Sequence, residues 1–449
     1  MQDKIKQATH LMSKKDYASV LALLDDEVDP KTANIETLLL YSEALLANGD
    51  LDAFEQLYQA VEKYYLPEAW IYMKKAIFLE RYDHREKAIQ NWDAGYKTRR
   101  YDANFILHYA IFLMRRNDFI KTEKIIRNAS YETRNQPEIL ELWGLALYRM
   151  DHFSAAIICL ERVIKTGQPN AQTYEVKARC LRQKKLFVSA LKDIAEALKH
   201  EPRNFSVLLN GSQIASILGF CQDAVAMLER ASALGENSPI LFWNLCVAYM
   251  RVGNWAKGWP LFHYRMLQDG FAKMHDIPPK AAWRGEFLKN DTILIIGEQG
   301  LGDTIHYGRY IKLIRQNNPN AKIIFEGHKS LHRLVLKLNC NQAITPEQRD
   351  QITFDHYVLI MSLAHIFNAK ADQIYKKSGY LEVDDQQAPI QFKRKKETFI
   401  VGFNWFGSPS NPRNADRNIP FKLLHPLIAI ESIIPVSLQL WPAEKEIVK

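Results

Sequence analysis

Small and large apolar residues recur along residues 1–268 with a fixed period of 34. A small residue stands at each step. A large apolar residue follows it sixteen positions later in every repeat and three positions later in nearly every repeat. The small residues are Ala8, Ser42, Ala76, Ala110, Gly144, Ala178, Ser212 and Cys246; those sixteen positions later are Leu24, Tyr58, Trp92, Ile126, Leu160, Ile194, Leu228 and Phe262. The pattern predicts two antiparallel helices per repeat, because a small residue permits close approach and large residues fill the space around it.

The turns between the predicted helices carry matching signals. Gly49, Gly219 and Gly253 fall where the turn needs a positive φ, and Pro202 closes a repeat. The pattern is that of the tetratricopeptide repeat (TPR), in eight consecutive units over residues 1–268. We therefore predict an all-α superhelix whose concave face is lined by the first helix of each repeat and binds a protein or peptide partner.

Two asparagines occupy equivalent positions on the predicted first helices. Asn210 and Asn244 lie one repeat apart, where their amides could hydrogen-bond the backbone of an extended peptide. The earlier equivalents are Lys6, Leu40, Lys74, His108, Leu142 and Val176, so there is no long asparagine ladder. Two interpretations stay open: a peptide groove, or asparagines bonded to water and to their own chain.

The 34-residue period ends at a linker, residues 269–290, which has paired prolines and is packed by Trp283. Short β-branched apolar runs then alternate with amphipathic segments. Strands are predicted at 292–297, 321–327 and 354–363, and helices at 304–316 and 328–338. This alternation predicts an α/β, Rossmann-like domain with a parallel sheet over residues 291–383.

A second α/β unit begins after a polar linker. Residues 398–449 contain a predicted strand at 399–405, a loop rich in Gly, Ser, Asn and Pro, a helix after Pro420, and a strand at 433–440. About fifty residues are too few for a complete doubly wound sheet, so we predict the incomplete start of a second Rossmann-like domain.

The segment GEQGLGDT, residues 297–304, joins the first predicted strand to its helix. Ligands of parallel sheets bind at such loops, and a helix N-terminus offers free N–H groups. Gly297, Gly300 and Gly302 would permit close backbone approach and unusual φ and ψ. The spacing is GxxGxG, which matches neither the dinucleotide fingerprint nor a P-loop. Asp303 is either a functional carboxylate or the N-cap of the helix.

Composition narrows the classes of function. The chain is 47% hydrophobic, as packed domains require, and its net charge of +8 is spread along the sequence. The basic run 393–396 lies in a linker, so no nucleic-acid partner is expected. Five cysteines lack CxxC spacing, the N-terminus lacks an apolar signal region, and no run of eighteen apolar residues occurs. These features predict a cytoplasmic protein without disulfides, a metal site or a membrane span.

Several motifs together resemble a known family. The chain resembles bacterial TPR proteins with a C-terminal heptosyltransferase-like glycosyltransferase domain in three segments: GEQGLGDTIHYGRYI, VGFNWFGSPSNPRNADRNIPF and SLQ. It is more distantly similar to protein O-GlcNAc transferase. The join, with PLFHYR and WRGE, resembles the one in that family. The resemblance implies a GT-B fold, with the acceptor held by residues 291–383 and a nucleotide-sugar donor held by residues 398–449.

The resemblance also implies roles for individual residues. Asp303 would be the general base that takes the acceptor hydroxyl proton in an inverting, metal-independent transfer. Arg417 would be the cation beside the diphosphate. The acceptor loop would comprise Gln299, Gly300, Leu301, Gly302 and Thr304, and the donor side would comprise Asn404, Arg417 and Gln439. The nucleotide-sugar would be a co-substrate, and no cofactor is implied.

The sequence departs from the family at two places. Asn418 stands where the family more often has serine, and the later block with an acidic-Thr-Ala turn does not occur before Lys449. We therefore expect either a fragment of a longer protein or an inactive enzyme, and no sugar transfer by these 449 residues alone. Two functions remain: a glycosyltransferase whose repeats select a protein or glycan acceptor, and a non-catalytic scaffold whose repeats bind a protein.

Overall fold

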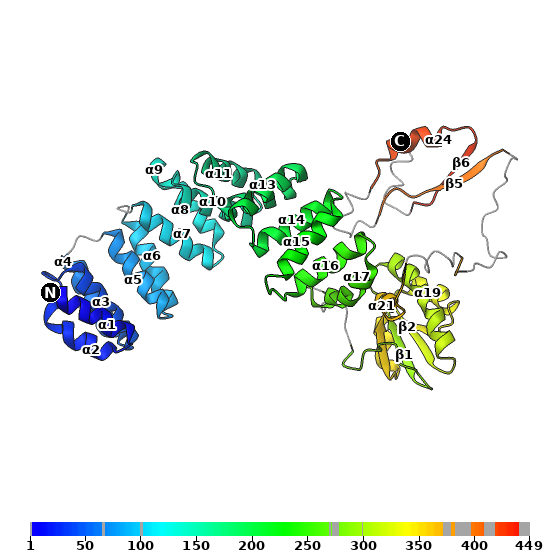
Figure 1. Cartoon of the computed structure of the whole chain (residues 1–449), viewed down its shortest axis with the longest axis horizontal. Coiled ribbons are helices and arrows are strands. Elements are labelled where there is room, and N and C mark those ends of the chain that lie inside the picture. Colours follow the sequence, from blue (N-terminus) through cyan, green and yellow to red (C-terminus); the bar gives the residue numbers. More distant parts are fainter. Residues whose placement is uncertain are drawn as a thin grey trace. The chain divides into compact units, whose positions relative to one another are not determined.

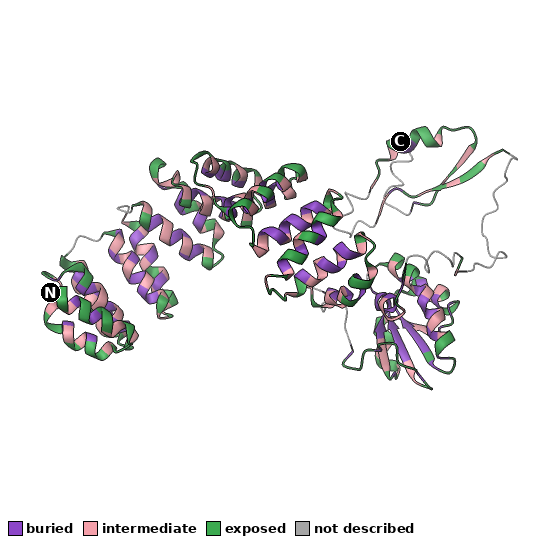
Figure 2. Ribbon diagram, viewed as in Figure 1, coloured by how far each residue is buried: buried purple, intermediate pink, exposed green. Residues whose placement is uncertain are grey.

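The computed structural model describes residues 2–64, 68–98, 102–268, 271, 278–298, 300–370, 379–381, 397–407 and 418–439. The chain forms two compact units, Met1–Lys376 and Lys377–Lys449. In the first unit, helices α1 to α17 precede a small sheet (Figure 1). Buried residues follow one side of the long helices of the repeat region and make up most of strands β1 and β2 (Figure 2).

Helices of the repeat region come in pairs, and both members recur every 34 residues as predicted. The first helices are α1 (Gln2–Ser13), α3 (Ile35–Ala47), α5 (Ala69–Arg81), α7 (Ala103–Arg115), α10 (Pro137–Arg149), α12 (Ala171–Gln183), α14 (Phe205–Ile217) and α16 (Pro239–Arg251). The second helices are α2 (Tyr17–Leu24), α4 (Leu51–Tyr64), α6 (Arg85–Lys97), α8 (Phe119–Arg127), α11 (Phe153–Lys165), α13 (Phe187–His200), α15 (Cys221–Ser232) and α17 (Trp255–Leu261). The predicted N-terminal all-α TPR array is therefore confirmed.

The predicted contact between the small and the large residue is visible in the fifth repeat. A Cβ added to Gly144 would lie 2.9 Å from Leu160, the large residue sixteen positions later. All eight small residues of the period are buried. Close approach of the paired helices thus depends on the absence of a larger side chain at this position.

The turn within each repeat has the same backbone conformation in all eight units. Gly49, Gly219 and Gly253 have φ of +84°, +85° and +76°, as predicted. The other five units place a non-glycine residue at this position with φ between +60° and +66°: Lys15, Asp83, Asn117, Asp151 and Lys185. The repeat therefore imposes the left-handed turn even where glycine is missing, although this conformation strains other residues.

The fourth repeat keeps the 34-residue period with a shortened second helix and one additional short helix. Its second helix, α8, ends early at Arg127, and a four-residue helix, α9 (Tyr131–Arg134), fills the connection to α10. The Ser130 hydroxyl accepts a hydrogen bond from the Thr133 backbone N–H and so caps α9. The sequence period alone gave no indication of this extra turn.

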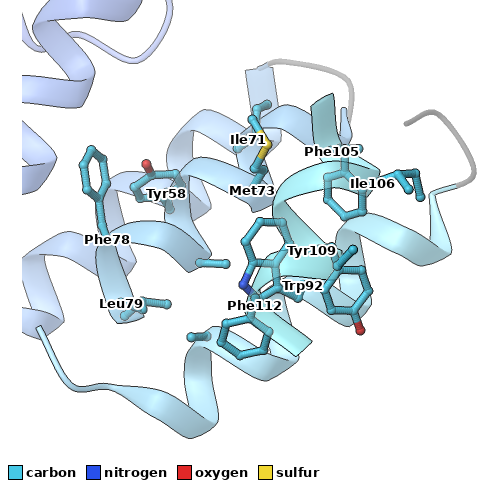
Figure 3. Packing of buried hydrophobic residues seen from close by; sticks show 14 of the residues in the cluster. Tyr58, Ile71, Met73, Phe78, Leu79, Trp92, Phe105, Ile106, Tyr109 and Phe112 are labelled. Atoms are coloured by element: carbon cyan, nitrogen blue, oxygen red, sulfur yellow. The ribbon is translucent and has the colours of Figure 1, made fainter. Parts of the chain in front are cut away.

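An aromatic cluster fills the core of the third and fourth repeats. Trp92 of α6 is fully buried and stacks on Tyr109 of α7, with ring centroids 5.3 Å apart and planes 3° apart. Phe105 meets Trp92 edge-on, and Phe112 lies against it at 5.8 Å (Figure 3). Large rings in such contact contribute both buried area and specific ring–ring attraction.

We predict that Trp92→Ala lowers the free energy of unfolding by about 3–5 kcal/mol, since it leaves a large cavity. Trp92→Phe should cost clearly less, because the indole N–H has no hydrogen-bond partner among the described residues and only packing is lost. Urea denaturation followed by circular dichroism measures both. Equal losses for the two variants would contradict this packing role.

The α/β part of the first unit is a four-stranded parallel sheet in the order β3-β2-β1-β4. Its strands are β1 (Thr292–Ile296), β2 (Lys322–Glu326), β3 (Gln342–Ile344) and β4 (His356–Leu359), and its long helix is α19 (Leu301–Asn317). Leu294, Ile296 and Ile324 form one face, which packs on Phe271 and on Met266 from the end of the array. The array and the sheet therefore share a hydrophobic core.

Several predicted boundaries in this part were wrong. The segment 354–363 is not one strand: β4 ends at Leu359, and the chain continues as a 3₁₀ turn, η5 (Ile360–Ser362), and a short helix, α21 (Leu363–Ile366). The predicted helix at 328–338 is a 3₁₀ turn, η3 (Lys329–Leu331), followed by a five-residue helix, α20 (His332–Leu336). Strand β3 was missed, since three residues are too few to show a period.

The second unit contains one pair of parallel strands, β5 (Phe399–Phe403) and β6 (Ile433–Ser437). A 3₁₀ turn, η7 (Phe421–Leu424), and a short helix, α24 (His425–Ile428), lie between them in the sequence. Trp405 is buried and packs on Phe421 with ring centroids 4.7 Å apart. The predicted strand–loop–helix–strand order is confirmed for the described residues.

Candidate functional site

Polar side chains connect the first helices of the fifth to eighth repeats. We call this surface, formed by Glu141, Thr173, Glu175, Arg179, Arg182, Ser206, Asn210, Gln213 and Asn244, the first-helix face. At its start, Glu141 of α10 accepts hydrogen bonds from the Thr173 hydroxyl at 2.5 Å and from the Asn170 amide at 3.0 Å. These bonds join α10 to the N-terminus of α12.

Glu175 is the centre of this face. Its side chain is buried, and Oε1 accepts from Arg179 Nη2 at 2.6 Å, from the Ser206 hydroxyl at 2.6 Å and from Asn210 Nδ2 at 2.7 Å. A buried carboxylate is stable only when it is paired and hydrogen-bonded in this way. The contacts fix α14 against α12.

A second chain of contacts runs toward the last repeat. Arg182 Nη1 donates to Gln213 Oε1 at 2.6 Å, and Gln213 Nε2 donates to Asn244 Oδ1 at 3.4 Å. Burial lowers the pKa of Arg182, and the neighbouring charge of Arg179 lowers it further. The guanidinium of Arg182 therefore lies where an additional acceptor would be favourable.

Both arginines keep an unused donor. The Nε atoms of Arg179 and Arg182 are buried and have no hydrogen-bond partner among the described residues. A buried N–H without a partner costs free energy that an incoming carbonyl or carboxylate oxygen would recover. On the first-helix face, Glu141 and Glu175 accept several hydrogen bonds, whereas each arginine leaves one buried donor unused.

The two predicted groove asparagines lie within this face. Asn210 Nδ2 donates to Glu175 and to the Ser206 carbonyl, and Asn244 Nδ2 donates to the Ile240 carbonyl at 2.7 Å. Their amide N–H groups thus bond within the chain, as in the second of the two interpretations. Direct contact with a peptide stays a prediction for both.

Sequence reasoning missed the arginines and glutamates of this face. A signal was present: the position three residues before the small residue is Ile5, Leu39, Met73 and Leu107 in the first four repeats, and becomes Glu141 and Glu175 in the next two. The change from apolar to acidic at one repeat position marks where the first-helix face begins.

A buried ion pair joins the end of the array to the sheet. Arg265 lies in η2 (Phe262–Leu267), directly after α17, and Glu298 follows β1. Arg265 Nε and Nη2 donate to the two carboxylate oxygens of Glu298, each at 3.0 Å. Both side chains are nearly inaccessible, with 3% and 0% exposure. The Met361 backbone N–H also donates to Glu298 at 3.0 Å, so the carboxylate bridges the ends of β1 and β4 as well.

This pair occupies a defined place in the sheet topology. The chain leaves β1 toward β2 on one side, whereas β4 lies on the other side of β1. The carboxyl ends of β1 and β4 therefore form the switch point at which open α/β sheets bind ligands. The base of this switch point is filled by Glu298, Arg265 and Ser362. The Ser362 hydroxyl accepts from Arg265 Nη2 at 2.8 Å.

The loop after β1 leads into α19 at the same edge. The helix begins at Leu301, so Gly300 is its N-cap and Asp303 is its third residue. The Asp303 carboxylate accepts from the Gly300 backbone N–H at 3.0 Å. Asp303 thus caps the helix from inside its first turn, and the prediction that it is the N-cap residue was wrong in position. The residue is partly exposed.

The glycines of this loop only partly match the prediction. Gly297 is in close contact, since an added Cβ would lie 3.2 Å from the Glu326 carbonyl oxygen. None of Gly297, Gly300 and Gly302 has a positive φ, so the expected unusual backbone conformation is wrong. Leu301 and Gly302 are exposed, whereas Thr304 is buried. Gln299 lies outside the described residues.

The predicted donor residues belong to the second unit. Gln439 is buried; its Oε1 accepts from the Trp405 and Phe406 backbone N–H groups at 3.1 and 2.9 Å, and its Nε2 donates to the Phe406 carbonyl. It therefore holds the loop after β5, next to the exposed Asn404. The Asn418 side chain accepts from the Gly407 N–H at 3.0 Å. Arg417 lies outside the described residues.

The described residues contain no helix that is both long and apolar enough to cross a membrane. They also contain no group of three or more His, Cys, Asp or Glu side chains arranged to hold a metal ion.

Known proteins match this chain over part of its length. No family model matches the chain. Protein FlbA of Caulobacter vibrioides is 20% identical over 262 residues, which cover 53% of this chain. The chain spans only 43% of the length of FlbA, its distant relative.

Solved structures also overlap the chain in part. It is similar to YrrB, a TPR protein with an unusual peptide-binding site (14% identity, TM-score 0.33, covering 37% of this chain and 85% of YrrB). It is also similar to PilF of Pseudomonas aeruginosa (15% identity, TM-score 0.37, covering 49% of this chain and 96% of PilF). A third similar structure is the Cut9–Hcn1 tetramer of the APC/C (14% identity, TM-score 0.38, covering 54% of this chain and 48% of that chain). Because these scores are low, the TPR assignment rests on the period and helix pairs of this chain. The matches do not support sugar transfer.

We predict that Arg265→Ala destabilises the sheet by about 3–5 kcal/mol, because it leaves the Glu298 carboxylate buried and unpaired. The double variant Arg265→Met with Glu298→Met should be more stable than Arg265→Ala, since it removes both charges and keeps the volume. Urea denaturation followed by tryptophan fluorescence measures both. A loss below about 1 kcal/mol for Arg265→Ala would place this pair among weak surface ion pairs instead.

Proposed function

We propose that the chain is a protein-interaction scaffold, and that its first-helix face binds an acidic segment of a partner protein. The single observation that carries this is the pair of buried Nε–H donors of Arg179 and Arg182, which no described residue satisfies. A folded chain that keeps two such donors is more stable when a ligand supplies acceptors. TPR arrays in general present the faces of their first helices to partner segments.

The charge of the face selects the partner. Glu175 is neutralised by Arg179 and by the neutral donors of Ser206 and Asn210. Arg182 bonds only to the neutral Gln213 among the contacts found on this face. A partner carboxylate would therefore meet an uncompensated guanidinium, which recognises carboxylates through parallel N–H donors.

The test is a peptide array of twelve-residue segments, probed with the labelled chain. Acidic segments should bind, and Arg179→Gln with Arg182→Gln should weaken binding at least tenfold, since charged hydrogen bonds are worth about 1.5–3 kcal/mol. The matched control is Lys192→Gln with Arg203→Gln, which removes two exposed charges outside the first-helix face. Equal binding by both double variants, or no preference for acidic segments, would refute the proposal.

A second candidate function is sugar transfer, with the array selecting the acceptor. We propose it because Asp303 stands in the first turn of α19, next to the β1–β4 switch point, where acceptor hydroxyls would bind. Asp303 would act as general base toward the acceptor hydroxyl. The donor would meet the second unit, where Asn404 and Gln439 flank the loop after β5, and Arg417 would contact the diphosphate.

Asp303→Asn separates this function from the scaffold function. Asparagine keeps an oxygen that can accept from the Gly300 N–H, so α19 should begin unchanged while the base is lost. Transfer of labelled sugar from nucleotide-sugars should fall by about 10²-fold or more, and peptide binding should stay constant. Asp350→Asn, an exposed site in the same sheet region, is the control. Full transfer by Asp303→Asn, measured in a protein whose unmutated form transfers sugar, would contradict this function.

A further inference from the structure

A pocket of about 540 Å³ lies between the end of the array and the edge of the sheet. Its walls come from η2, from the segment 282–284, from β4 and from the turn and helix that follow β4. The residues that matter for its chemistry are His263, Trp283, Arg284, Tyr357, Ser362 and His365. Its volume is within the range of about 300–1,000 Å³ typical of small-molecule sites.

Two imidazoles meet inside this pocket. His263 from η2 and His365 from α21 contact edge to face, with ring centroids 5.0 Å apart. They come from parts of the sequence that are about a hundred residues apart, so the pocket exists only because the array packs on the sheet. Each neutral imidazole offers one donor and one acceptor nitrogen.

The charge around these imidazoles is positive. Arg284 lines the pocket with an exposed guanidinium that has no hydrogen bond or ion pair among the described residues. The charge of Arg265 also acts on His263. The partner of Arg265, Glu298, already accepts from Arg265 and from the Met361 N–H. Glu286 accepts from the Arg284 backbone N–H rather than from its guanidinium. None of the described lining residues is Asp or Glu.

The pKa of His263 reflects its burial and these positive charges. Burial, together with the charges of Arg265, His365 and Arg284, lowers its pKa to about 4. Burial also lowers the pKa of His365. Both rings are neutral near pH 7, and an anion in the pocket would oppose each of these effects.

The remaining wall suits a flat apolar group. Trp283 is buried, and its indole N–H donates to the Glu286 carbonyl at 2.8 Å, so the ring is held in place. Tyr357, Met266 and Ile366 complete a largely apolar surface. An aromatic or alicyclic body would bury area on these side chains while its charged group met Arg284.

We infer that this junction pocket binds a small organic anion, whose carboxylate or phosphate lies between Arg284 and the two imidazoles, and whose flat body packs against Trp283 and Tyr357. The site is independent of partner binding by the first-helix face and of sugar transfer at Asp303. Because η2 and α21 both line it, an occupied pocket joins the array to the sheet more firmly.

Calorimetric titration of the whole chain tests the inference with three probes of one ring size: benzoate, phenyl phosphate and neutral benzyl alcohol. At least one anion should bind once per chain, and at least tenfold more tightly than benzyl alcohol. The tighter anion shows whether carboxylate or phosphate is preferred. Arg284→Gln should weaken that anion at least tenfold, whereas Lys289→Gln, which removes an exposed charge from the same segment outside the pocket, should not change it.

The pH dependence gives a second readout. An anion raises the pKa of His263 from its low value, so binding takes up protons and the affinity should rise as pH falls from 7 to 5. His263→Gln should make this rise shallower. Lack of saturable binding by both anions, equal binding of benzyl alcohol, or full affinity in Arg284→Gln would overturn the inference.

Discussion

A pair of helices in this array cannot bury its apolar surface alone, and the rest of the structure depends on this constraint. Each small residue lets its helix pair close, as Gly144 does over Leu160, and the next repeat covers the side that stays open. The last pair has no following repeat, so the sheet covers it. Trp259 of α17 donates to the Ala369 carbonyl at 2.8 Å, and Arg265 reaches Glu298.

The packing of the sheet on the last helix pair limits where a ligand can bind. The carboxyl ends of β1 and β4 form the place where an open sheet would receive a ligand, but its base holds a saturated ion pair. Glu298 is therefore a structural carboxylate. The ligand sites that we propose lie elsewhere: at the arginine donors of the first-helix face, at Asp303 at the start of α19, and in the junction pocket around His263.

The sequence predicted the repeated helix pairs and the parallel strands, but few of the contacts between residues far apart in the chain. Eight helix pairs, their turns and the parallel strands follow from periods that many residues share, so single exceptions such as Lys185 at a left-handed position do not hide them. The Arg265–Glu298 pair was not predicted, because its partners are 33 residues apart and belong to different patterns. Likewise, no local signal brings His263 to His365, whose contact depends on tertiary packing alone.

Site-specific photo-crosslinking in cells tests most directly whether the first-helix face is the interaction surface. A photoreactive residue at Gln172, exposed on α12 beside this face, is compared with one at Lys192, exposed on the second helix α13. The account predicts a defined protein adduct from position 172, lost when Arg179 and Arg182 are replaced by glutamine, and none from position 192. Adducts of equal yield from both positions, or an adduct at 172 that survives loss of the arginines, would contradict it.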